Sequence, residues 1–73
     1  MGRTNVVAEV TGTVWKVEAQ PGTPVQPDDV VMLVESMKME IPVLATDAGS
    51  IAQILVQEGE MVQEGQTVAV IAT

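Results

Sequence analysis

Short runs of β-branched and other aliphatic residues recur along the chain, separated by polar turn residues. The two clearest runs, residues 30–34 and 41–44, lie on either side of a more polar segment. Such runs, bounded by turn signals, are typical of β-strands. Folding the segment about Met37-Lys38 places Ser36 opposite Met39 and makes the two apolar runs face each other. The pattern therefore predicts a β-hairpin with a lysine at its tip.

The two residues at the predicted tip are an unusual choice for a tight turn. Two-residue hairpin loops need positive φ angles, and they favour Asn-Gly or Gly-X for that reason. Met37-Lys38 satisfies neither preference. Because strained backbone is often found at functional sites, we interpret this turn as a candidate functional site.

An internal repeat surrounds the hairpin. Residues 12–35 align with residues 49–72 without a gap, and the matching positions are mainly glycines and aliphatic residues. The aligned pairs are Gly12/Gly49, Val14/Ile51, Val17/Ile54, Gln20/Gln57, Gly22/Gly59, Val25/Val62, Gln26/Gln63, Val31/Val68, Leu33/Val70 and Val34/Ile71. This periodicity indicates a duplicated β-unit.

Each copy of the repeat predicts the same series of elements: a longer strand, a turn, a short strand, a second turn and a final strand. Pro21-Gly22 and Glu58-Gly59 mark the first turn. The second turn contains Pro27-Asp28 in one copy and Glu64-Gly65 in the other, and aspartate tolerates a left-handed conformation better than most residues.

Three further features refine this prediction. Strict alternation breaks near Trp15-Lys16 and again near Ala52-Gln53, which indicates a β-bulge or a twist in each copy. Pro42 suggests an edge strand or a bend in the strand, since its nitrogen cannot donate to a ladder. Residues 1–4 look like a loose start, and a strand-like pattern runs from Val6 to Val10.

We therefore expect an all-β fold consisting of a single domain over residues 1–73, with repeat halves at about 12–35 and 49–72. The predicted architecture is a flattened β-barrel of two small four-stranded antiparallel sheets around an aliphatic core. A pseudo-twofold axis should relate the two halves. No segment shows a helical period with caps.

Composition and charge exclude several function classes. Ten acidic residues against Arg3, Lys16 and Lys38 give a net charge of −7, which repels nucleic-acid backbones. There is no histidine or cysteine to act as a general base, a thiolate ligand or a disulfide partner. No apolar run approaches the ~18 residues of a membrane span. We expect a cytoplasmic, monomeric domain with no catalytic residue, no metal site and no contact with nucleic acid or membrane.

The segment Glu35-Ser36-Met37-Lys38-Met39 resembles the attachment motif of biotinyl domains, the carrier domains of biotin-dependent carboxylases. That motif is a Met-Lys-Met triplet preceded by a small residue and, one position earlier, a glutamate. The small residue is commonly alanine, so Ser36 departs slightly from the pattern. The resemblance covers nearly the whole chain, from about Val6 to Ile71. It implies a thumbless biotinyl domain, because only four residues lie where one family variant inserts a thumb.

The resemblance also implies a role for each motif residue. The Lys38 amine would form an amide with biotin, and the tethered biotin would carry a carboxyl group between a biotin carboxylase and a carboxyltransferase, as in an acetyl-CoA or other acyl-CoA carboxylase. A biotin-protein ligase would attach the cofactor. Met37 and Met39 would offer adaptable apolar contacts to these partners, and Glu35, beside Ser36, would help the ligase to discriminate.

Two other functions stay open. Lipoyl domains share this fold but usually carry Asp-Lys-Ala at the turn, so the Met-Lys-Met triplet favours biotin over lipoate. An unmodified barrel-sandwich module for protein–protein contacts is the other alternative. An enzyme is disfavoured because Ser36 and Ser50 have no histidine partner.

Four residues outside the motif are interpreted as structural. Met32 and Met61 are expected to fill the core. Trp15 is expected to pack in the barrel wall, and Lys16 to be a surface charge.

Overall fold

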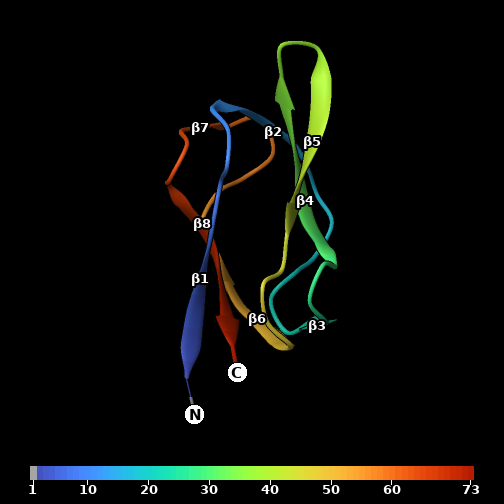
Figure 1. The fold of residues 1–73 in the computed structure, drawn as a ribbon, viewed down its shortest axis with the longest axis vertical. Helices are drawn as coiled ribbons and strands as arrows, with labels where there is room; N and C mark the ends of the chain where they lie inside the picture. Colours follow the sequence, from blue (N-terminus) through green and yellow to red (C-terminus); the bar gives the residue numbers. More distant parts are fainter. Residues whose placement is uncertain (1) are drawn as a thin grey trace.

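The computed structural model describes residues 2–73, and these residues form eight β-strands (Figure 1). The strands are β1 (Arg3–Val7), β2 (Gly12–Val17), β3 (Pro24–Val25), β4 (Val30–Ser36), β5 (Met39–Leu44), β6 (Gly49–Ile54), β7 (Met61–Val62) and β8 (Thr67–Ala72). None of the described residues belongs to a helix long and apolar enough to cross a membrane.

The strands build two four-stranded sheets in which every pairing is antiparallel. One sheet has the order β1-β8-β6-β3 and the other β5-β4-β2-β7. The molecule measures 37 × 18 × 17 Å, with the β4–β5 hairpin at one end and both termini at the other (Figure 1). The predicted fold class and the predicted hairpin are confirmed.

The pseudo-twofold symmetry extends to the register of individual residue pairs. Every pair between β2 and β4 has an equivalent between β6 and β8; Val14 opposite Val34, for example, corresponds to Ile51 opposite Ile71. The register shifts at Trp15 in one sheet and at Ala52 in the other, as predicted. The same equivalence relates β4–β5 to β8–β1.

The first strand differs from its predicted position. It begins at Arg3 and ends at Val7, so residues 3 and 4 are not a loose start and the strand does not extend to Val10. Thr4 and Val6 point inward while Arg3 and Asn5 face solvent. One face of this antiparallel sheet packs on the core and the other is in contact with water, so only alternate residues need to be apolar. Met1 lies outside the described residues.

The core is aliphatic. The fully buried side chains are Met32, Ile51, Ile71, Val6, Val14, Val31, Val34, Val62 and Val68. Met32 therefore fills the core as predicted, but the same prediction for Met61 is wrong, because this side chain is 71% exposed. Strand β7 has two residues, and Val62 takes the inward position, so its neighbour points outward. Trp15 lies on the outer surface of the wall and is 45% exposed.

Local backbone requirements match the turn residues. Asp28 has φ 74° and its equivalent Gly65 has φ 86°, so the predicted left-handed aspartate is confirmed.

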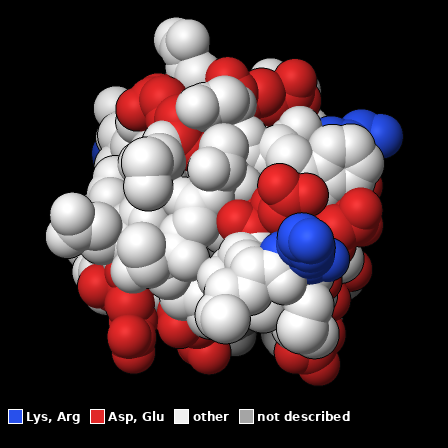
Figure 2. Space-filling view, turned by 90° about the horizontal axis from the view of Figure 1, so that it is seen from above, with Lys and Arg blue, Asp and Glu red and all other residues white. Residues whose placement is uncertain are grey.

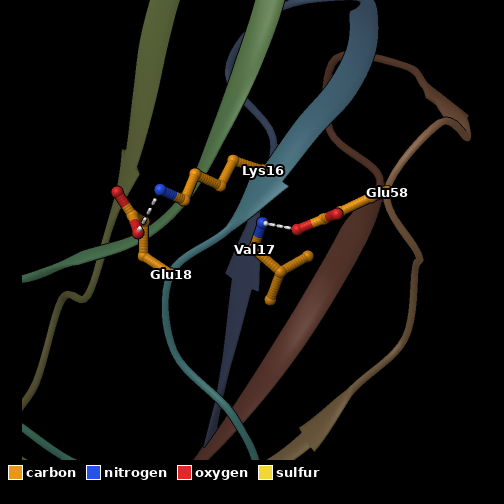
Figure 3. A network of polar contacts seen from close by, with 4 residues as sticks. All are labelled: Lys16, Val17, Glu18 and Glu58. Atoms are coloured by element: carbon orange, nitrogen blue, oxygen red, sulfur yellow. Dashed lines mark hydrogen bonds and ion pairs between the residues drawn. The ribbon is translucent and has the colours of Figure 1, made fainter.

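Figure 3 shows a contact without an equivalent in the second copy, in which the Val17 N–H donates to Glu58 Oε2 at 3.0 Å. Pro21 occupies the position equivalent to Glu58 and has no acceptor on its side chain.

Candidate functional site

The β4–β5 hairpin pairs as the sequence predicted. Ser36 lies opposite Met39, and the next pairs are Glu35 with Glu40 and Val34 with Ile41. These pairs leave Met37 and Lys38 as the two loop residues. Their φ angles are 53° and 66°, and positive φ at both loop positions is the mark of a type I′ turn.

The turn holds its side chains away from the body of the protein. Met37 is 92% exposed and Met39 is 63% exposed, although methionine is an apolar side chain. Lys38 is exposed as well, whereas Ser36 is half-buried. The hairpin is the longest projection of the fold (Figure 1). An amine here is open to approach from several directions.

The electrostatic surroundings of this amine are acidic but loosely arranged. Glu35 and Glu40 are exposed and stand directly opposite each other behind the turn. Within residues 2–73, the ion pair found joins Lys16 Nζ to Glu18 Oε1 at 3.8 Å, so no carboxylate of this range holds Lys38 in an ion pair. Figure 2, which looks onto the hairpin end, shows scattered acidic side chains around a broad uncharged area. The Lys38 amine is therefore accessible to solvent rather than held in an ion pair by residues 2–73.

The hollows found on the described surface lie away from the hairpin. A shallow open hollow of about 570 Å³ lies between the two halves and includes no hairpin residue. Its lining is Val17, Gln20, Pro21, Ile54, Val56, Gln57 and Glu58. Residues 2–73 contain no group of three or more metal-ligating side chains.

The hairpin unites all the site residues that the sequence singled out. Glu35 and Ser36 end β4, Met37 and Lys38 form the turn, and Met39 begins β5. Sequence reasoning missed the exposure of Trp15 and Met61 on the same sheet. The signal for Met61 was its neighbour Val62. A two-residue strand can point only one side chain inward, and Val62 takes that position, so Met61 points outward.

Comparison with known proteins places this geometry in a family. The biotin–lipoyl family model, described as "Biotin-requiring enzyme", matches residues 4–71. The chain belongs to the biotin–lipoyl attachment family. A relative from Mycobacterium leprae, "Biotinylated protein TB7.3 homolog", is 43% identical over 68 residues, which cover 93% of this chain and 96% of that protein.

Larger enzymes contain similar segments. Pyruvate carboxylase of Bacillus subtilis is 46% identical over 66 residues, which are 86% of this chain but 6% of the enzyme. The crystal structure of Kluyveromyces lactis urea carboxylase matches with a TM-score of 0.93 and 39% identity, over 99% of this chain and 6% of that one. The chain is thus a biotinyl domain, a carrier of covalent biotin of the kind found in biotin-dependent carboxylases.

Proposed function

We propose that Lys38 is the residue to which biotin is attached, and that this domain carries the cofactor between the active sites of a carboxylase. The observation that supports the proposal is the exposed lysine at the tip of a hairpin, on a turn whose two residues both have positive φ. Lys16, the other lysine, lies within β2 and pairs with Glu18.

The residues of the hairpin fit the attachment chemistry. The Lys38 amine would attack the acyl carbon of biotinyl-adenylate formed by the ligase, so that an amide bond replaces the acyl–phosphate bond and AMP and one proton leave. Met37 and Met39, exposed on either side, supply apolar contacts that adapt to the ligase and later to the carboxylase.

The bound biotin supplies a ring nitrogen that accepts and releases a carboxyl group. The chain contributes reach and concentration. A lysine arm on a rigid, elongated body lets the cofactor visit two sites in turn, and tethering replaces free diffusion with a high effective concentration. The domain itself makes and breaks no bonds in this scheme and is a non-catalytic carrier.

Three partners follow from this role: a biotin-protein ligase, a biotin carboxylase and a carboxyltransferase that uses an acceptor such as an acyl-CoA. The assignment of these partners is supported by the relatives named above, which include whole carboxylases. We further propose that the domain is monomeric and cytoplasmic.

The test is the intact mass of the domain after co-expression with a biotin-protein ligase. The wild-type domain and a Lys16→Arg control should each gain the mass of one biotinyl group, and Lys38→Arg should gain none. Lys38→Arg should keep its urea-unfolding midpoint, because the side chain makes no ion pair with residues 2–73. A lipoyl mass would show a lipoyl carrier instead, and a biotinyl group on Lys38→Arg would refute the assignment of the site.

A further inference from the structure

The sheet that carries the lysine hairpin has two exposed large apolar side chains on its outer face, Trp15 and Met61, next to the exposed Pro42 and the half-buried Thr13 and Leu33. In order across the strands, Met61 of β7 lies opposite Thr13 of β2, and Leu33 of β4 lies opposite Pro42 of β5. Trp15 occupies the bulge of β2, between the residues that pair with β4. We call these five residues the Trp15 face. Met61 is 71% exposed and Trp15 is 45% exposed.

The internal duplication provides a comparison surface within the same molecule. The positions equivalent to Trp15, Met61 and Pro42 on the outer face of the other sheet are Ala52, Pro24 and Asn5. Both sheets have the same register, and the second one folds with smaller or more polar residues. The fold therefore does not require a tryptophan and a methionine on the first sheet.

The charges beside this face are also unequal between the halves. Glu35 and Glu40 stand directly opposite each other on the same face, an arrangement that destabilises a strand pair. Lys16, which lies opposite Leu33 on the same face, pairs with Glu18 at 3.8 Å, so neither glutamate has a basic ion-pair partner within residues 2–73. The equivalent pair in the other sheet is Ala72 with Arg3. An exposed apolar area bordered by unneutralised acids is the complement of an apolar socket bordered by basic side chains.

We propose that the Trp15 face docks the domain onto a protein surface of that kind, with an apolar socket for Trp15 and Met61 and with arginine or lysine residues facing Glu35 and Glu40. The partner is the biotin carboxylase that acts on the tethered cofactor, so this inference rests on the proposed function. A second copy of this chain is a poor occupant, because two acidic borders would repel each other at a net charge of −7 per chain. Docking through this face brings the hairpin, which belongs to the same sheet, to the active site in a fixed orientation.

The first experiment uses the single tryptophan as a reporter. Labelling the biotinylated domain with 5-fluorotryptophan gives one ¹⁹F resonance, which we expect to shift or broaden when the unlabelled biotin carboxylase from the same organism is added. The resonance of the domain alone should not depend on its concentration. A concentration-dependent shift without partner would show self-association and overturn the proposal, as would an unchanged resonance at saturating carboxylase.

The second experiment measures the KM for the biotinylated domain in bicarbonate-dependent ATP hydrolysis by the same carboxylase. We compare Trp15→Ala/Met61→Ser with the matched control Val7→Ala/Pro24→Ser, which alters exposed residues on the outer face of the other sheet. Trp15→Ala reproduces the residue found at the equivalent position, so the bulge accommodates it. Loss of a central tryptophan at an interface predicts a rise in KM of about 30-fold, with less than a twofold change for the control.

Two measurements separate failure of this inference from failure of the proposed function. Intact mass reports biotin on Lys38 before each assay, and turnover of free biotin reports the carboxylase by itself. Normal biotinylation with equal KM values for the two double variants would overturn the docking face alone. If the wild-type domain acquires no biotin, or the carboxylase does not turn it over, the proposed function fails and the docking face fails with it.

Discussion

At the scale of single residues, the turn at Met37 and Lys38 is a compromise between stability and exposure. A non-glycine residue in the left-handed region costs roughly 1–2 kcal/mol, and here two such residues follow each other. Six pairs of β4 with β5 lie directly behind them and hold the conformation. The conformation keeps the lysine on the outermost point of the fold while its neighbours stay regular.

Replacing Met37 by asparagine should separate the stability of the turn from its recognition by the ligase. Asparagine enters the left-handed region more readily than methionine, so we expect Met37→Asn to raise the free energy of unfolding by about 0.5–1 kcal/mol. The same change removes the apolar contact that we propose Met37 makes to the ligase, so the rate of biotinylation should fall severalfold. Urea unfolding and the initial rate of biotin incorporation measure the two quantities.

Asp28→Gly is the matched control for this substitution. Asp28 also has positive φ, and its equivalent in the other copy is Gly65. It lies in a turn away from the hairpin, so the control should gain stability without any change in the rate of biotinylation. If Met37→Asn were modified as fast as the wild-type domain, Met37 would have no role in recognition by the ligase.

At the scale of elements, the two copies keep several equivalent hydrogen bonds even where the accepting side chains differ. The Gln20 N–H donates to Thr23 Oγ1 in one copy, and the Gln57 N–H donates to Glu60 Oε1 in the other. One hydrogen bond has no equivalent in the other copy, because both its donor and its acceptor are replaced there. The Glu64 N–H donates to Thr11 Oγ1, whereas the equivalent positions hold Pro27, which has no N–H, and Ala48, which has no hydroxyl. The backbone N–H groups of Gln20, Gln57 and Glu64 therefore each have a side-chain acceptor, and Pro27 has no N–H that needs one.

Two equivalent glycines give a prediction on strand packing. A Cβ atom at Gly12 would collide with the carbonyl oxygen of Glu35, and one at Gly49 would collide with that of Ala72. Because both obstacles are backbone, Gly12→Ala and Gly49→Ala should each lower the free energy of unfolding by about 3 kcal/mol. Only Gly12→Ala displaces the strand that leads to Lys38, so it alone should also slow biotinylation of the folded fraction.

Thermal unfolding and the rate of biotin incorporation at a low temperature, where both variants are folded, check this prediction. Gly2→Ala serves as the control, since its Cβ would meet only the flexible side chain of Thr73. Equal rates for Gly12→Ala and Gly49→Ala would show that the hairpin is insensitive to the strand behind it.

How much of this could be predicted from the sequence depends on how strongly local chemistry fixes each element. The hairpin register follows from a two-residue loop between apolar runs, and the bulges follow from broken alternation, so both are confirmed. The start of β1 and the direction of Met61 were predicted wrongly. Both belong to strands at the margins of the sheets, where one neighbour decides the orientation of a side chain and the pattern is too short to reveal it.

At the scale of the whole molecule, the sequence repeat does not reveal how the halves are joined. The short strand β3 of the first copy pairs with β6, and β7 of the second copy pairs with β2, so each copy contributes a strand to the sheet of the other. This exchange depends on contacts between distant parts of the chain, which hydrophobic periodicity does not encode. It closes one core between the two sheets, and the halves should therefore unfold together.

The same small body carries a net charge of −7, and this excess of negative charge should make its stability depend on salt. The cross-section of 18 × 17 Å places many acidic residues within the ~30 Å Debye length of 0.01 M salt, and 1 M salt shortens that length to ~3 Å. Self-repulsion destabilises a compact state. We therefore expect the free energy of unfolding to rise by roughly 1 kcal/mol between 0.01 and 0.5 M NaCl.

A variant with two fewer charges identifies the cause of the salt effect. Glu9→Gln/Glu64→Gln changes the formal net charge from −7 to −5, since −7 + 2 = −5, and alters two exposed side chains. If self-repulsion is responsible, urea unfolding of this variant should show higher stability at low salt and a smaller gain with NaCl. An equal gain for both proteins would instead indicate that salt strengthens apolar burial. Docking to a basic partner must respond to salt with the opposite sign, because the same ions that stabilise the free domain screen its attraction to that surface.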